Sequence, residues 1–135
     1  MRLTDGQKTR LGEFARVMLP GSSRMPSAVD LDLWHNPVDE VLAIDPTRLE
    51  PLLQFLALEG PVETLADVEA LAQADTSGFE ALGVVLANAY FMHTAVRESI
   101  GYPGQEARDS SGGLSEEDEA LLAPVIARGP IYRPA

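Results

Sequence analysis

The chain has 135 residues, enough for one domain that buries a core of its own. Its 21 Asp and Glu residues against 10 Lys and Arg residues give a net charge of −11, and this field repels phosphate backbones and anionic membranes. We therefore exclude nucleic acid as a partner. The absence of cysteine also excludes disulfides, thiolate metal sites and thiol catalysis.

The N-terminal 20 residues predict a helix. Thr4 is a good N-cap, and apolar residues recur at helical spacing from Leu11 onward. Residues 20–36 form a long connection, rich in proline and serine, that needs an anchor of its own. Trp34 is the side chain that we expect to anchor it.

The start of the chain has no apolar signal-peptide core, and no uncharged apolar run is long enough to cross a bilayer. These features predict a soluble, acidic, cytoplasmic protein that does not insert into a membrane. Export together with a partner is the alternative.

The middle of the chain predicts short helices. Asn36 and Asp45 are each a good N-cap followed by proline, which favours a helix start at both positions. The leucine-rich run after Asp45 closes at Gly60, and a further helix is expected from Thr64 to Ala74.

The longest apolar helical stretch predicts a central helix at about residues 77–100. Apolar side chains from Phe79 to Ala95 lie on nearly all of its sides, which is typical of a buried helix. Residues 104–114 are expected to form a mobile loop, a last helix should start at Ser115, and residues 129–135 should form an extended tail. The predicted fold is all-α: a single domain, 1–135, in which five to six helices form a small bundle around the central helix.

Catalytic residues are not expected in this chain. His93 could act as a general base, but no second histidine or Glu-x-x-His pattern accompanies it, and we favour a histidine packed in the core. A ligand pocket between the helices remains open as an alternative. Its candidate lining residues are Trp34, Asn88, Tyr90 and His93.

A metal site is not expected either. His35 lies among acidic residues in a mixture that could bind a cation, but an acidic loop beside helix N-termini explains the same residues without a metal. The neighbouring acidic residues are Asp30, Asp32, Asp39 and Glu40.

The most distinctive string follows the central helix: Gly101-Tyr102-Pro103-Gly104-Gln105. It predicts a helix end with glycine at C′ and a tight Pro-Gly turn. It is also suited to recognition, because an aromatic side chain on a rigid turn binds a partner at low entropic cost.

Together with Ala89-Tyr90-Phe91-Met92 and the residues Val96 to Ile100, this string resembles the C-terminal signature of the gluconate 2-dehydrogenase subunit 3 family. The residues Val41 to Pro46 also resemble the middle of that family, so the resemblance covers about residues 25–105.

The resemblance implies a non-catalytic accessory subunit that binds or escorts a large flavin-dependent sugar or alcohol dehydrogenase of the glucose–methanol–choline type. FAD would belong to that partner, and this chain would hold no cofactor. The partner-binding residues that it implies are Arg97, Tyr102, Pro103, Gly104 and Gln105. A self-associating helical domain that binds a small ligand is the alternative.

Overall fold

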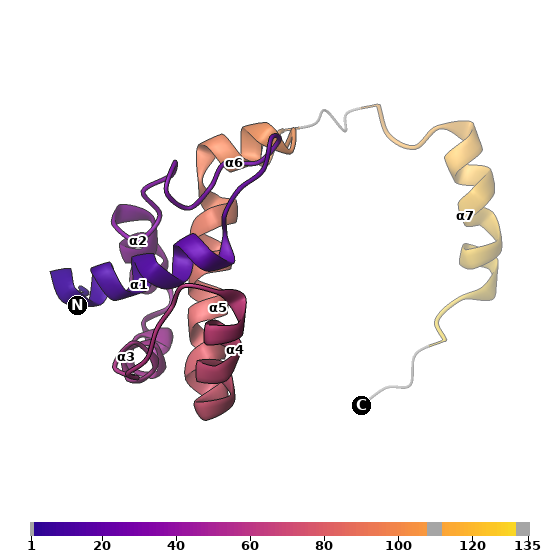
Figure 1. Ribbon diagram of the computed structural model, residues 1–135. Coiled ribbons are helices and arrows are strands. Elements are labelled where there is room, and N and C mark those ends of the chain that lie inside the picture. Colours follow the sequence, from indigo (N-terminus) through magenta and orange to yellow (C-terminus); the bar gives the residue numbers. More distant parts are fainter. Residues whose placement is uncertain (1, 108–111, 132–135) are drawn as a thin grey trace. The chain divides into compact units, whose positions relative to one another are not determined.

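The computed structural model of the chain describes residues 2–107 and 112–131. Their regular secondary structure is entirely helical, which confirms the predicted all-α class (Figure 1). The chain divides into two compact units, Met1–Gly104 and Gln105–Ala135. The single domain expected from the sequence stays a prediction. The expected loop at 104–114 and the expected tail at 129–135 lie partly outside the described residues.

The first unit contains α1 (Asp5–Met18), α2 (Asn36–Ile44), the short 3-10 helix η1 (Pro46–Arg48), α3 (Leu49–Leu56), α4 (Leu65–Ala74), α5 (Thr76–Met92) and α6 (Thr94–Ser99). The second unit contains α7 (Glu116–Arg128). No helix among residues 2–107 and 112–131 is long and apolar enough to cross a membrane.

Helix starts follow from local capping. Thr4 opens α1 and Thr64 opens α4, each in a capping box that pairs its side chain with the residue three positions on. Asp75 opens α5 by accepting a hydrogen bond from the Gly78 amide at 2.9 Å. The helix starts predicted at Thr4 and Thr64 are therefore confirmed, and α5 begins close to the predicted residue 77.

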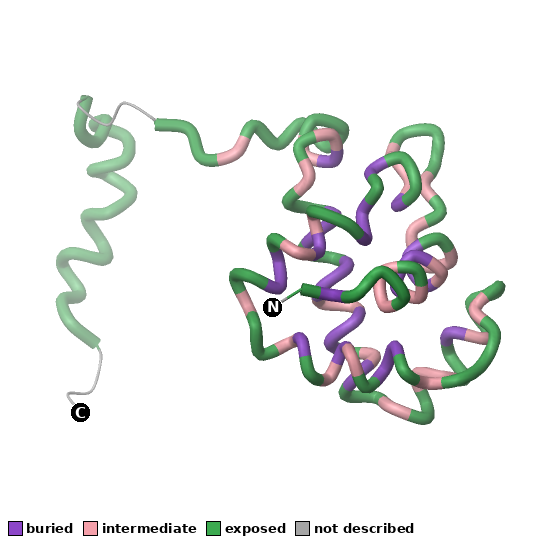
Figure 2. Tube along the Cα trace, turned by 90° about the vertical axis from the view of Figure 1, so that its left-hand side faces the viewer, coloured by how far each residue is buried: buried purple, intermediate pink, exposed green. Residues whose placement is uncertain are grey.

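Helix α5 lies at the centre of the first unit, where α2, α3, α4 and α6 all pack against it. The residues that it buries are Gly78, Ala81, Leu82, Val85, Leu86, Ala89 and Tyr90. At its start, Phe55 of α3 packs between Phe79 and Phe14, with ring centroids 5.9 and 5.2 Å apart. Buried residues concentrate where these helices face one another (Figure 2).

The predicted central helix at 77–100 is wrong in one respect: it is interrupted at His93. This residue has an extended backbone (φ −67°, ψ 132°), ends α5 and begins α6. Its ring Nδ1 accepts a hydrogen bond from the Ala95 amide at 3.3 Å, so the side chain caps α6. His93 is therefore a half-buried capping residue, and not the core side chain expected on a continuous helix.

Burial on all sides of the central helix is also wrong at its C-terminal end. Phe91 and Met92 are 57% and 47% exposed, and Asn88 is exposed as well. Neighbouring helices cover the face of α5 that carries Leu82 and Leu86 but leave these later side chains open.

The long connection at 20–36 is anchored by Trp34, as predicted. The indole is only 9% exposed, and a Cβ on Gly12 of α1 would come within 3.0 Å of it, so the ring packs directly on the α1 backbone. The Arg16 guanidinium lies over the same ring, 4.8 Å from its centroid. This packing fixes the segment that leads into α2.

Candidate functional site

The end of α6 forms a Schellman motif around Gly101. The Gly101 amide donates to the Glu98 carbonyl at 3.0 Å, and the Tyr102 amide donates to the Arg97 carbonyl at 2.8 Å. Gly101 has φ 69°, the left-handed conformation that glycine adopts without strain. The predicted helix end with glycine at C′ is confirmed.

The segment at 101–104 presents Tyr102 to solvent, and no backbone hydrogen bond among the described residues closes the predicted Pro-Gly turn there. The side chain is 51% exposed although its backbone is hydrogen-bonded to the helix. Gly104, with φ 93°, lies beside Arg97: a Cβ placed on it would be 4.0 Å from the Arg97 Nη1. Pro103 is exposed, and Gln105, also exposed, begins the second unit. The structure thus brings together Arg97, Tyr102, Pro103 and Gly104.

Arg97 has a polar atom without a partner. Its side chain is half-buried, and its Nε is shielded from solvent without a hydrogen-bond partner among the described residues. A buried donor in that state loses hydration without compensation.

The four residues predicted to line a pocket do not line one cavity together. His93 lines a cavity of about 380 Å³ beside the start of α2, whereas Tyr90 lines an apolar cavity of about 200 Å³ beside the end of α1. Trp34 is packed on α1, and Asn88 is exposed. The Tyr90 hydroxyl donates to the Pro26 carbonyl at 2.8 Å, and burial raises the pKa of this tyrosine.

Several residues that line the His93 cavity were missed from the sequence. Asp32, Asn36 and Glu40 approach it from the start of α2, and His93 and Thr94 approach from the junction of α5 and α6. The spacing of four residues between Asn36 and Glu40 is a signal that places these two on one side of α2, whereas Asp32 precedes the helix. This spacing does not by itself indicate a cavity, because His93 meets these residues only through the packing of α2 against α5.

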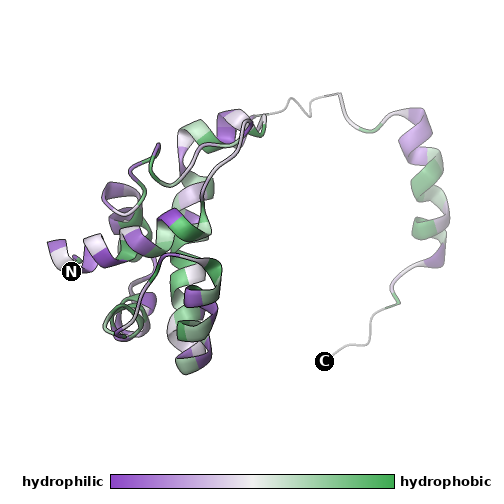
Figure 3. Cartoon of the chain, in the orientation of Figure 1, coloured by the Kyte–Doolittle hydropathy of each residue, from purple (hydrophilic) through white to green (hydrophobic). Residues whose placement is uncertain are grey.

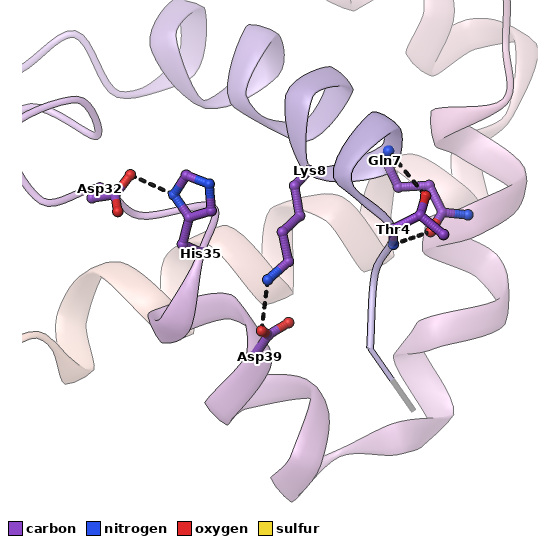
Figure 4. A network of polar contacts seen from close by, with 6 residues as sticks. All are labelled: Thr4, Gln7, Lys8, Asp32, His35 and Asp39. Atoms are coloured by element: carbon purple, nitrogen blue, oxygen red, sulfur yellow. Dashed lines mark hydrogen bonds and ion pairs between the residues drawn. The ribbon is translucent and has the colours of Figure 1, made fainter.

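Asp32 and Asp39, two of the acidic residues near His35, have separate partners (Figure 4). The His35 Nδ1 lies 2.5 Å from the Asp32 Oδ1, and Asp39 pairs with Lys8 of α1, with 2.7 Å between Nζ and Oδ2. Ser27 hydrogen bonds hold the pKa of Asp30 below its usual value. Within residues 2–107 and 112–131, no three His, Asp or Glu side chains gather closely enough to hold a metal ion.

Comparison with models of protein families found no match, and comparisons with curated proteins and with solved structures found no significant similarity. The family resemblance of residues 25–105 therefore stays a prediction. Function is proposed below from the geometry of the chain and from that resemblance.

Proposed function

We propose that this protein is a non-catalytic accessory subunit that binds a flavin-dependent sugar or alcohol dehydrogenase of the glucose–methanol–choline type. The turn from Gly101 to Gly104 is the proposed contact. The observation that carries the proposal is the half-exposed Tyr102 ring on a backbone that is hydrogen-bonded to α6. The resemblance of the same residues to the subunit 3 family names the class of partner.

The geometry suits an interface anchor for two reasons. The backbone of Tyr102 is already held by its hydrogen bond to Arg97, so burying the ring in an interface would cost no further backbone entropy at this residue. The half-buried guanidinium of Arg97, whose Nη1 lies beside Gly104, also offers a donor to a carboxylate or carbonyl of the partner. Such a contact combines apolar burial with one charged hydrogen bond.

Co-purification from the native host tests the proposal directly. The protein is expected to elute with a larger subunit whose absorption spectrum is that of bound flavin. If it elutes alone, or with a protein that carries no flavin, the proposed partner class is wrong.

A pair of variants then tests the contact. Tyr102→Ala is expected to weaken binding to the purified partner by at least tenfold, because truncation of an interface anchor costs about 2 kcal/mol. Its unfolding midpoint should stay within a few degrees of the parent. Ile44→Ala is the matched control, since Ile44 is 71% exposed on α2, outside the turn. A Tyr102→Ala protein that is broadly unfolded would instead show that the ring is structural.

A second function is favoured by one observation, the cavity of about 380 Å³ beside His93. Its volume lies in the range of small-molecule sites, and its polar lining includes the carboxylates of Asp32 and Glu40. These groups suit a small ligand that carries an amine. A thermal-shift screen of polyamines and amino alcohols would reveal stabilisation that His93→Ala reduces. No shift with any amine would remove this function.

A further inference from the structure

The helix α7 has two chemically different halves. Ser115 caps it in a capping box with Asp118, and the first turn consists of four acidic residues, Glu116 to Glu119. The turns that follow are apolar as far as Ala127, and Arg128 is the basic residue of the last turn. Figure 3 shows the change from a hydrophilic start to a hydrophobic continuation.

The apolar half of α7 is uncovered within the second unit, where no residue of the helix is buried. Leu121, Leu122, Val125 and Ile126 are 71%, 39%, 52% and 74% exposed. Their spacing of one, four and five residues places them on one face of the helix. Leu122 and Ile126 line a groove of about 500 Å³ together with Leu114.

Helix α7 is expected to be stable only when another surface buries its apolar face. It has 13 residues, a length at which an isolated helix is marginal in water. Pro124 in its interior also removes one backbone hydrogen bond. The capping box stabilises only the first turn. Burial of the apolar face against another surface would supply the stability that the helix lacks alone.

We propose that α7 docks through this face into an apolar groove of another protein, whose Lys and Arg side chains rim the end that receives Glu116 to Glu119. Charge complementarity selects this occupant, because four carboxylates at one end of an apolar face match a cationic rim. This inference goes beyond the proposed function, since it concerns α7 and not the end of α6. It holds whether or not the protein that binds α7 carries flavin.

The acidic first turn of α7 disfavours three other partners: a second copy of the helix, the first unit of the chain and an anionic lipid surface. A second copy of α7 would set four carboxylates against the single Arg128 of the last turn. The first unit is acidic too, with acidic residues outnumbering basic ones by about two to one. Anionic lipid attracts amphipathic helices with basic polar faces, and the polar residues of α7 are mainly acidic. Each of these surfaces would repel the first turn of α7.

Photo-crosslinking of the full chain in cells of the native host identifies the occupant. A benzophenone amino acid replaces Ile126 in one variant and Ala120 in the control. Six residues along a helix turn it by about 240°, so Ala120 faces away from the apolar side. We expect an adduct with one other protein, at least fivefold stronger from position 126, at a peptide that contains Lys or Arg.

Binding of that protein, purified, to the full chain completes the test. Ile126→Asp should weaken the affinity at least tenfold. The triple variant Glu116→Gln, Glu117→Gln and Glu119→Gln keeps the capping box and should lower both the affinity and its dependence on salt. In the crosslinking, the proposal is overturned by an adduct with a second copy, the first unit or lipid, by equal adducts from positions 126 and 120, or by no adduct. In the binding measurement, it is overturned by an affinity that does not change with salt concentration.

Discussion

The tightest helix contact in the first unit can be tested with a single methyl group at Gly78. This residue is buried in the first turn of α5, where a Cβ would come within 2.7 Å of the Phe55 Cβ on α3. It would also collide with the Asp75 carboxylate that caps α5. The Phe55 Cβ is attached directly to the α3 backbone, so rotating that side chain does not remove the overlap.

The expected cost of Gly78→Ala follows from three effects. Overpacking costs about 1–3 kcal/mol, and displacing the Asp75 cap costs about 1 kcal/mol. Removing glycine from a helix returns roughly 0.5–1 kcal/mol. The net result is a destabilisation of about 2 kcal/mol, a large share of the roughly 5–15 kcal/mol that holds a typical domain together.

Gly83→Ala is the matched control on the same helix. A Cβ at Gly83 meets nothing within 4 Å, so only the helix-propensity gain remains, and stability should rise by about 0.5–1 kcal/mol. Urea unfolding followed by far-UV circular dichroism measures both variants. If Gly78→Ala is as stable as Gly83→Ala, α3 and α5 do not approach as closely as described, and the reasoning is wrong.

Three further outcomes are expected. Tyr90→Phe should lower stability by about 1 kcal/mol in urea unfolding, because the Pro26 carbonyl loses its donor. Hydrogen bonds from the Glu63 amide, and from the amide and hydroxyl of Thr64, hold the pKa of Asp67 below its usual value. The stabilisation from Asp67 is therefore present above the unfolded pKa of about 3.9 and is lost as pH falls through the lower folded value. Asp67→Asn should flatten the fall of the thermal midpoint between about pH 5 and pH 2. His93→Ala should speed amide hydrogen exchange in α6, because it removes the cap of that helix. His93→Asn should not, because asparagine is also a good N-cap. Equal exchange rates in the two variants would argue against capping by His93.

The helix starts at Thr4, Thr64 and Ser115 were predictable from the sequence because capping is local. The predicted N-cap Asn36, by contrast, is the first residue of α2, which follows His35 without a side-chain cap. A threonine and an acceptor three residues later are sufficient to form the capping box at Thr64, and the same logic holds at Ser115. The glycine C-cap at Gly101 is local in the same way. Each of these features depends on residues no more than five positions apart, so the sequence pattern alone predicts it.

The break at His93 was not predictable because helical periodicity continues across it. Apolar residues on either side keep the spacing of one long helix, and histidine is a less common cap than serine or aspartate. The cavity beside His93 was missed for a related reason, since Glu40 and His93 meet only through the packing of α2 against α5. Contacts between residues so distant in sequence leave no local pattern.

The exposure of Phe91 and Met92 bears on the size of the proposed contact. Between Phe91 and Tyr102, four large apolar side chains are about half exposed, the other two being Met92 and Ile100. Single exposed apolar residues are ordinary on a protein surface, and it is a contiguous patch that marks an interface. We expect a partner bound to the turn to cover the end of α5 as well, so that the four side chains form one contact. We therefore expect Phe91→Ala to weaken partner binding by several-fold while Ile44→Ala does not, measured by calorimetric titration; equal affinities of the two variants would confine the contact to the turn.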